Sequence, residues 1–170
     1  MSPVVPRTGI VLAVILLLVP SGTVHAAPCW PPPVVAPVTD PFREPACAWC
    51  PGNRGIEYGT SPGASVRAVA TGRVTFAGSV TGTVYVVVRH GDGRRVTYGN
   101  LDAARFDVDD LVVRGQVIGR AAGAFHFGLR VGDRYVDPGA HLGRYVRRPR
   151  LIPSDGTAGN PAPPPRLSCT

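Results

Sequence analysis

The chain contains no lysine, because all 18 of its basic residues are arginine. This absence excludes the carrier domains that attach biotin or lipoate to a lysine side chain. Aromatic residues make up only 7% of the chain, and neither a basic helix nor a zinc-finger spacing accompanies them. We therefore expect no nucleic acid among the partners. A Gly-x-Ser-x-Gly elbow, a phosphate loop and a dinucleotide fingerprint are also missing, which excludes the enzyme classes that depend on them.

Helical periodicity is missing as well, since glycine interrupts the chain roughly every ten residues. Short segments rich in β-branched residues follow one another instead, separated by turn residues. The predicted strands are 56–58, 66–70, 73–77, 83–90, 94–98, 107–113, 116–119, 124–130 and 134–136. Gly91-Asp92-Gly93 predicts a tight hairpin between two of them. At 170 residues the chain has the length of one all-β domain with its own core.

One long apolar run occurs near the start, Ile10–Val19, after the single charge of Arg7. It is short for a membrane span and is followed by small residues that end at Ala26. This pattern is typical of a secretory signal peptide over 1–26. We therefore expect a secreted, cell-wall-associated protein with no integral membrane segment after cleavage. The net charge of +7, which becomes +6 when Arg7 leaves with the signal peptide (7 − 1), suits an acidic polymer such as a cell wall.

Composition divides the remainder into three parts. Residues 27–46 are rich in proline and predict an extended lead-in on the surface of the next part. Residues 47–146 hold the predicted strands and form the domain. Residues 147–170 are rich in arginine, proline and small polar residues, and predict a disordered tail.

Four cysteines lie outside the leader, namely Cys29, Cys47, Cys50 and Cys169. A secreted location favours disulfides. The Cys-Ala-Trp-Cys spacing at 47–50 is also that of redox sites and zinc knuckles, but a thioredoxin-like setting and a second ligand pair are not visible. We predict a structural Cys47–Cys50 bridge, and a Cys29–Cys169 pairing would tether the tail.

The stretch 124–130 alternates strictly between large apolar residues and small or polar residues. Such a period of two indicates a strand with one face toward the core. The core-facing residues are Phe125, Phe127 and Leu129. The opposite face carries His126 between two small neighbours, which leaves space above the sheet. The pattern predicts either the floor of a groove or a half-exposed histidine without a further role. Two other histidines, His90 and His141, are expected in a structural and a surface position, and Asp137 in a turn.

Several motifs follow one another in chain order between Pro41 and Leu142. They are Arg-Gly-Ile-Glu-Tyr at 54–58, the run from Pro62 to Gly78, Val-Val-Arg-His-Gly-Asp-Gly at 87–93, Thr-Tyr-Gly-Asn-Leu at 97–101, Gly-Gln-Val-Ile-Gly at 115–119, Phe-His-Phe-Gly-Leu-Arg at 125–130 and Val-Asp-Pro at 136–138. This series resembles the lysostaphin-type (LytM-like) zinc metallopeptidases. The resemblance implies a duplicated-hybrid (barrel-sandwich hybrid) β-fold with a groove across the sheet, and the family's cleavage of peptide cross-links in peptidoglycan.

The resemblance also implies where the site lies. The family's first two metal ligands, a histidine and an aspartate, correspond to Asn53 and Glu57, and the third corresponds to His126. Its two helper histidines correspond to Asn100 and Ala124. A catalytic zinc site needs three protein ligands and an open water position. We therefore expect a degenerate member without a cofactor, in which Glu57 and His126 are the remaining candidate metal ligands and no catalytic residue is left.

A groove that has lost its metal can still bind a peptide. We predict groove contacts from Asn53, Asn100, His126 and Arg130, the last to a carboxylate of a cross-link peptide. The expected function is a non-catalytic cell-wall binding or hydrolase-regulating module, with peptidoglycan or a cell-wall hydrolase as its partner. The alternatives are an active zinc metalloendopeptidase with a rearranged site, and a purely structural wall module.

Overall fold

The computed structural model describes residues 29–47, 49–147, 149, 154 and 161–169. The predicted signal peptide lies outside these residues. The strands are β1 Val38–Asp40, β2 Gly55–Tyr58, β3 Ser65–Arg67, β4 Gly72–Val80, β5 Thr83–His90, β6 Arg95–Leu101, β7 Leu111–Val112, β8 Val117–Val131, β9 Arg134–Val136, β10 Arg144–Val146 and β11 Arg166–Ser168, and a 3-10 helix, η1, spans Pro138–His141. In this part of the chain no helix is long and apolar enough to cross a membrane.

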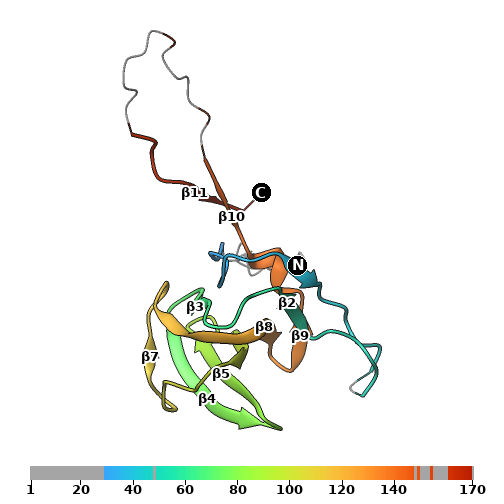
Figure 1. The fold of residues 1–170 in the computed structure, drawn as a ribbon. Helices are drawn as coiled ribbons and strands as arrows, with labels where there is room; N and C mark the ends of the chain where they lie inside the picture. The colour runs from blue at the N-terminus through green and yellow to red at the C-terminus, as the bar shows by residue number, and fades with distance from the viewer. Residues whose placement is uncertain (1–28, 48, 148, 150–153, 155–160, 170) are drawn as a thin grey trace, which may run out of the picture.

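The main sheet is built around β8, which is 15 residues long. This strand pairs antiparallel with β2, β3, β6 and β9. The longest path through the sheet runs β1-β2-β8-β6-β5-β4-β7. Figure 1 shows β8 crossing the middle of the body, with β4 and β5 below it in this view. The prediction of an all-β fold is confirmed.

The core lies on the face of β8 that the alternation predicted. Phe125, Phe127 and Leu129 are completely buried there. Tyr98 of β6 packs against both phenylalanines, with ring centroids 6.4 and 5.7 Å away. Its hydroxyl accepts a hydrogen bond from the Val69 amide at 3.0 Å, which satisfies the one polar group of a fully buried side chain.

Two of the predicted strands, 116–119 and 124–130, are parts of the single strand β8. The sequence suggests a break between them because Gly119 and Gly123 interrupt the pattern. A Cβ at Gly119, however, would stand 3.1 Å from a methyl of Leu101. This glycine therefore permits close packing on β6 and does not end the strand.

The proline-rich lead-in packs on the domain, where most of its residues stay at least partly exposed and a few are buried. Trp30 is 3% exposed and sits between His90 and His141, with ring centroids 5.7 and 5.4 Å away. Its amide donates to the His141 carbonyl at 2.8 Å. His141 is consequently half-buried and not a surface residue. Further along, β1 pairs with β2 at the edge of the sheet. A tryptophan contributes enough apolar area to hold such a segment on the core.

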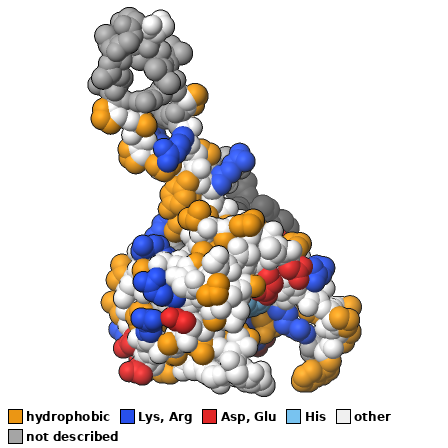
Figure 2. All heavy atoms as spheres, viewed as in Figure 1, with side chains coloured by type: hydrophobic (Ala, Val, Ile, Leu, Met, Phe, Trp, Pro, Cys, Tyr) orange, Lys and Arg blue, Asp and Glu red, His pale blue; other side chains and the backbone are white. Residues whose placement is uncertain are grey.

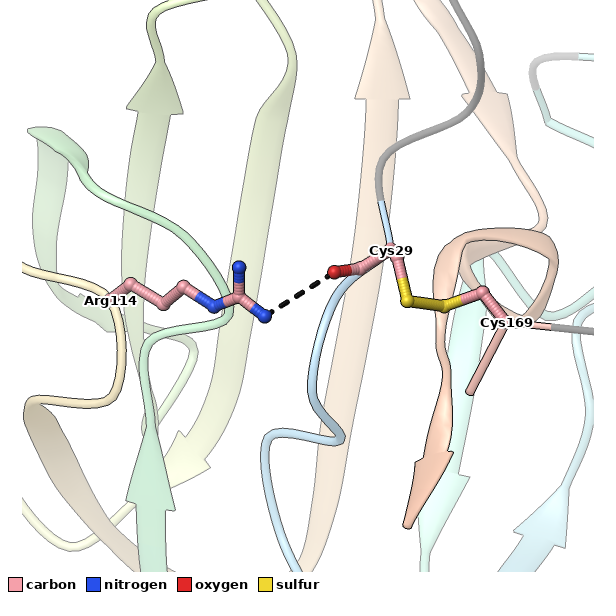
Figure 3. The surroundings of a disulfide bond; sticks show 3 residues. All are labelled: Cys29, Arg114 and Cys169. Carbon is pink, nitrogen blue, oxygen red and sulfur yellow. Dashed lines mark hydrogen bonds between the residues drawn. A yellow bond between two sulfur atoms is a disulfide. The ribbon is translucent and has the colours of Figure 1, made fainter. Parts of the chain in front are cut away.

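A two-stranded ribbon of β10 and β11 rises from the body (Figure 1). A disulfide joins Cys169, directly after β11, to Cys29 at the start of the lead-in (Figure 3), where Arg114 donates to the Cys29 carbonyl at 3.4 Å. Residues 166–168 of the predicted disordered tail are therefore ordered, because the disulfide and strand pairing hold them. Most of 148–160 lies outside the described residues. Figure 2 shows arginine side chains along the ribbon, where Arg144, Arg147 and Arg166 are exposed.

Candidate functional site

The pairing of β2 with β8 brings two of the predicted site residues together. Glu57 and His126 are directly opposite each other in the register. The Nδ1 atom of His126 lies 2.6 Å from Oε1 of Glu57, and the two side chains are 24% and 30% exposed. Since the carboxylate can only accept, Nδ1 carries the hydrogen and donates it. Nε2 is thus the nitrogen that this pair leaves for a ligand or water.

The His126 ring lies over one glycine of the neighbouring strand β2 and one glycine of its own strand β8. A Cβ at Gly55 would stand 2.6 Å from Cε1 of His126, and a Cβ at Gly128 would stand 3.2 Å from Nε2. Any side chain at Gly55 would collide with the ring. The two glycines therefore form a flat bed that fixes where the imidazole can lie.

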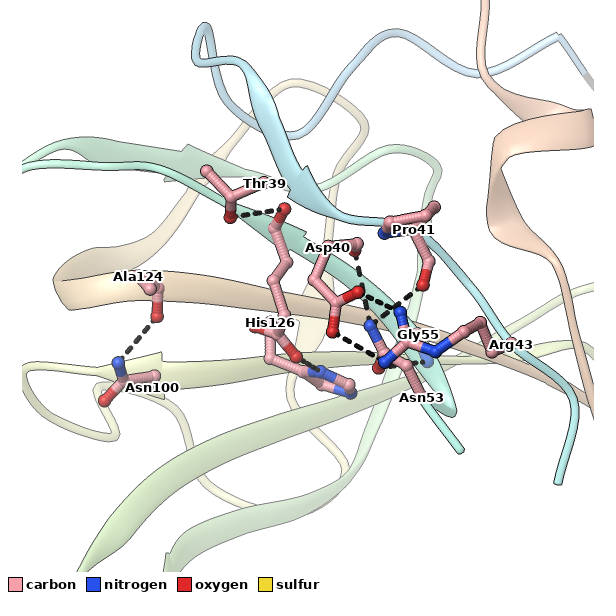
Figure 4. Close-up of polar contacts among 10 residues, drawn as sticks. Thr39, Asp40, Pro41, Arg43, Asn53, Gly55, Asn100, Ala124 and His126 are labelled. Carbon is pink, nitrogen blue, oxygen red and sulfur yellow. Dashed lines mark hydrogen bonds and ion pairs between the residues drawn. The ribbon is translucent and has the colours of Figure 1, made fainter. Parts of the chain in front are cut away.

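Asn53 lies beside this bed but is 8% exposed (Figure 4). Its amide nitrogen donates to the carbonyls of Asp40 and Pro41 at 3.3 and 3.2 Å. Its amide oxygen accepts from the Gly55 backbone at 3.2 Å. Both donor hydrogens are used, so Asn53 ties the lead-in to β2. The sequence predicted instead that Asn53 contacts a ligand in the groove, because the sequence alone did not show that the lead-in supplies hydrogen-bond acceptors for its side chain.

Sequence reasoning missed the pair Asp40 and Arg43, which lies next to Asn53 in Figure 4. Arg43 and Asn53 exchange backbone hydrogen bonds at 3.0 and 2.9 Å, and this bridge brings the guanidinium to the site. Two guanidinium nitrogens of Arg43 reach the two carboxylate oxygens of Asp40. The hydrogen bond from Arg43 lowers the pKa of Asp40, which keeps this exposed carboxylate ionised. The Asp-Pro-Phe-Arg spacing, with opposite charges three residues apart, was the available signal.

The two helper positions are also neighbours in space. The side-chain amide of Asn100 donates to the backbone carbonyl of Ala124 at 2.6 Å. Asn100 has a φ of +58°, the left-handed region that asparagine tolerates. It lies where the register between β6 and β8 shifts. The five positions implied by the resemblance therefore form two groups, Asn53 with Glu57 and His126 where β2 adjoins β8, and Asn100 with Ala124 where β6 adjoins β8.

These residues do not fit the zinc ion of the lysostaphin-type family. Among the described residues, no group of three or more histidine, cysteine, aspartate or glutamate side chains is arranged to hold a metal. Asn53 is committed to backbone groups, and Glu57 is committed to His126. Two donors fall short of the three protein ligands of a catalytic zinc site.

A groove of about 590 Å³ opens on the same face of the sheet, further along the strands. Its lining residues are Thr75, Phe76, Val80, Tyr85, Val87, Arg89, Arg95, Thr97, Arg130 and Tyr135. Of the four predicted groove residues, only Arg130 lines it. Arg130 lies over the Tyr135 ring, with its guanidinium carbon 5.0 Å from the ring centroid. The alternation of β5 and β6 could have indicated these residues, but their neighbours depend on the strand register.

The predicted Cys47–Cys50 disulfide is present. The Cys50 amide donates to the Cys47 carbonyl at 3.1 Å, which closes a tight turn. The turn lies between Arg43 and Asn53, so it connects the lead-in to the segment that carries the site. The structure thus agrees with the structural role that the sequence predicted for this bridge.

Comparison with known proteins points to one family. The sequence profile of peptidase family M23 matches residues 51–138. An uncharacterized protein of Mycobacterium tuberculosis is 30% identical over 127 residues, which cover 68% of this chain and 30% of that protein. The murein hydrolase activator EnvC of Escherichia coli is 34% identical over 99 residues, which cover 54% of this chain and 24% of EnvC.

The solved structure of Helicobacter pylori Csd3 is similar in fold, with a TM-score of 0.60 and 22% identity over 74% of this chain and 38% of that one. This chain spans well under half the length of these three proteins. The profile covers more than half of the sequence, since 88 of 170 residues lie between 51 and 138. The chain belongs to peptidase family M23.

Proposed function

We propose that this chain is a secreted, non-catalytic M23 domain that acts at the cell wall, where it binds peptidoglycan or regulates a wall hydrolase. The observation that carries the proposal is the state of the three ligand positions. Glu57 and His126 satisfy each other at 2.6 Å, and Asn53 is buried in hydrogen bonds to the backbone. An asparagine amide is a weaker zinc ligand than imidazole, and this one has no donor hydrogen left for a peptide.

The missing helper groups support the same conclusion. In metallopeptidases of this type a histidine positions protons during the reaction, and loss of one such group costs on the order of 10²–10⁴-fold in rate. Asn100 and Ala124 interact with each other through an amide and a backbone carbonyl. Neither group can take and return a proton near neutral pH.

A relative, the leader-like pattern and the disulfides support the proposed location and partner. The EnvC protein of Escherichia coli is named as an activator of murein hydrolases, and 24% of its length matches this chain. The leader-like pattern over 1–26 supports secretion. The two disulfides are of the kind that persists in an oxidising compartment.

A second candidate function is zinc-dependent cleavage of peptidoglycan peptides by a rearranged site. The observation that favours it is the Glu57–His126 pair itself, because both side chains are zinc ligands in other proteins. A metal that replaced the hydrogen between Nδ1 of His126 and Oε1 of Glu57 would still need a third protein ligand, and no histidine, cysteine, aspartate or glutamate among the described residues is arranged to supply it.

Metal analysis together with a wall assay tests the proposal. We expect the purified mature protein to contain substoichiometric zinc, to leave the turbidity of purified sacculi unchanged, and either to sediment with sacculi or to alter the activity of a wall hydrolase. Stoichiometric zinc with loss of turbidity would establish the second candidate. Protein that neither sediments with sacculi nor changes hydrolase activity would refute the wall-directed role.

A double substitution tests the assignment of the ligand positions. Asn53→His with Glu57→Asp restores the family's histidine and aspartate beside His126, and we expect this variant to bind zinc in a calorimetric titration. Asn100→His is the matched control, because Asn100 lies at the Ala124 carbonyl and not among the ligand positions. Equal zinc affinity in both variants would show that the ligand positions are misassigned.

A further inference from the structure

The exposed face of the sheet is organised in rows that run across the strands. In one row Arg73 pairs with Arg89, Arg89 with Arg95, Arg95 with Arg130 and Arg130 with Tyr135, so that β4, β5, β6, β8 and β9 each contribute one residue. We call Arg89, Arg95 and Arg130, the three of these arginines that line the groove, the arginine row. The next row on the same face contains Val87, Thr97, Gly128 and Gly55. The third contains Tyr85, Gly99, His126 and Glu57.

The arginine row is unfavourable for the fold by itself. Like charges directly opposite each other on neighbouring strands destabilise a sheet. Asp133 is the acid that reaches the row, 3.2 Å from Arg95 and 3.4 Å from Arg130, and its side chain is 95% exposed. Arg89 has no ion-pair partner among the described residues. The three arginines that line the groove therefore have an excess of two positive charges (3 − 1), and Arg73, opposite Arg89 on β4, adds a further positive charge at the end of the row.

The row also lines the groove, beside aromatic and aliphatic side chains. Tyr85, Val87 and Tyr135 form apolar parts of the lining. Arg130 is held in place by Tyr135, and its Nε is buried without a hydrogen-bond partner. A guanidinium that is stacked on a ring loses little freedom when it binds a planar, forked acceptor. These features fit a ligand that has one carboxylate next to an apolar group.

We propose that the groove binds a short peptide by its free carboxylate, which the arginine row receives in a charge-assisted, forked contact. The apolar side chain next to that carboxylate packs on Tyr85 and Val87. The peptide then crosses the second row, in which Gly128 and Gly55 have no side chains, toward Glu57 and His126. Arg130 and His126 are four residue steps apart along β8, about 13 Å, which is the length of roughly four extended peptide residues.

The charge pattern favours such a peptide over a polyanion. A phosphate polymer that ran along the strands toward Glu57 would need positive side chains in every row, whereas the second row carries no charge and the third row includes the acid Glu57. A ligand with one charged end and an uncharged remainder matches the three rows. That the peptide belongs to the cell wall rests on the function proposed above; recognition of the carboxylate does not.

The test compares N-acetylated tetra-alanine that ends in a free carboxylate with the same peptide as its C-terminal amide. We expect the amide to bind the full-length mature protein at least tenfold more weakly in a calorimetric titration. Arg130→Gln and Arg89→Gln should each weaken binding of the acid several-fold and leave that of the amide unchanged. Arg89 is exposed, so its variant should fold normally. Arg105→Gln is the matched control, an exposed arginine outside the groove.

Equal affinities for acid and amide, absence of binding to either peptide, or inorganic phosphate binding as tightly as the acid would overturn the proposal. Sedimentation with sacculi separates this result from the proposed function. If the protein sediments with sacculi but binds the acid and the amide equally, the wall function is supported and the carboxylate site is refuted. If the protein binds the acid more tightly than the amide, but neither sediments with sacculi nor alters the activity of a wall hydrolase, the carboxylate site is supported and the wall function is refuted.

Discussion

The surroundings of a single residue, His126, show how cross-strand neighbours decide the role of a side chain. Its Nδ1 is held by Glu57 from β2, and its ring rests on Gly55 and Gly128. The imidazole is therefore restrained on its edge and on its face. In a strand with larger neighbours the same histidine would have to turn away from the sheet.

We predict that Gly55→Ala destabilises the protein by about 1–3 kcal/mol, the usual cost of forcing a methyl group into a packed site. The added Cβ would meet Cε1 of His126 and the Phe127 carbonyl oxygen, both at 2.6 Å. Either the ring or the pairing of β2 with β8 must shift. Urea denaturation measures the loss. Gly91→Ala is the control, since its Cβ would meet nothing within 4 Å. Equal stability of the two variants would contradict the tight fit of the ring.

Among the structural elements, the lead-in depends on one buried contact. Trp30 fills the space between His90 and His141, and hydrogen bonds to and from the backbone of η1 and Gly143 hold its main chain. His90 donates from Nδ1 to the Thr71 carbonyl at 2.9 Å, and its Nε2 is buried without a partner. Burial lowers the pKa of His90, and it lowers that of His141 together with the charge of Arg94.

These shifts predict that acid loosens the lead-in. A histidine whose pKa is lowered in the fold binds fewer protons folded than unfolded, so its stabilising effect is present above the unfolded pKa of about 6.5. The effect is lost as the pH falls below that value. We expect the melting temperature to fall between pH 7 and pH 5, and Trp30 fluorescence to report it in a Trp49→Phe background. Trp49 is 95% exposed, so this change should not disturb the fold.

The variant His90→Gln isolates this contribution. It should be less stable than the parent at pH 7, because the ring contact with Trp30 is lost. Its melting temperature should depend less steeply on pH, because one buried titrating group is gone. An unchanged slope in His90→Gln and in His141→Gln would show that other groups govern the acid response.

At the scale of the whole molecule, the two disulfides close loops of very different length. Cys47–Cys50 closes a turn with a sequence separation of 3, whereas Cys29–Cys169 joins positions 140 residues apart. In the chain-entropy model the longer loop contributes about 5 kcal/mol and a four-residue loop about 2 kcal/mol. The Cys29–Cys169 bridge therefore links the lead-in, the body and the ribbon into one unit.

We predict that Cys29→Ser with Cys169→Ser lowers the free energy of unfolding by about 2–5 kcal/mol. The paired substitution avoids a free thiol. Cys47→Ser with Cys50→Ser, the matched control, should lose less, because its loop is short. Urea denaturation of both variants makes the comparison. A larger loss in the control would mean that the Cys47 turn, and not the long-range bridge, is the main covalent support of the fold.

The local features of this protein could be predicted from its sequence. Strict alternation over 124–130 predicted which residues face the core, and neighbouring residues predicted the hairpin at Gly91-Asp92-Gly93 and the Cys47–Cys50 bridge. Each of these depends on short-range geometry, such as the period of a strand or the reach of a turn. The motif series was likewise enough to identify the family.

Which residues lie beside one another became visible only in the folded chain. The burial of Trp30, the use of Asn53 by the lead-in and the meeting of Arg130 with Arg95 each join different strands or segments of the chain. A strand pattern tells which face a residue occupies but not which residue stands opposite. That neighbour is set by pairing register, and a shift of one position would place the arginines on the other face. The site depends on register and docking, which arise from the packing of the whole chain.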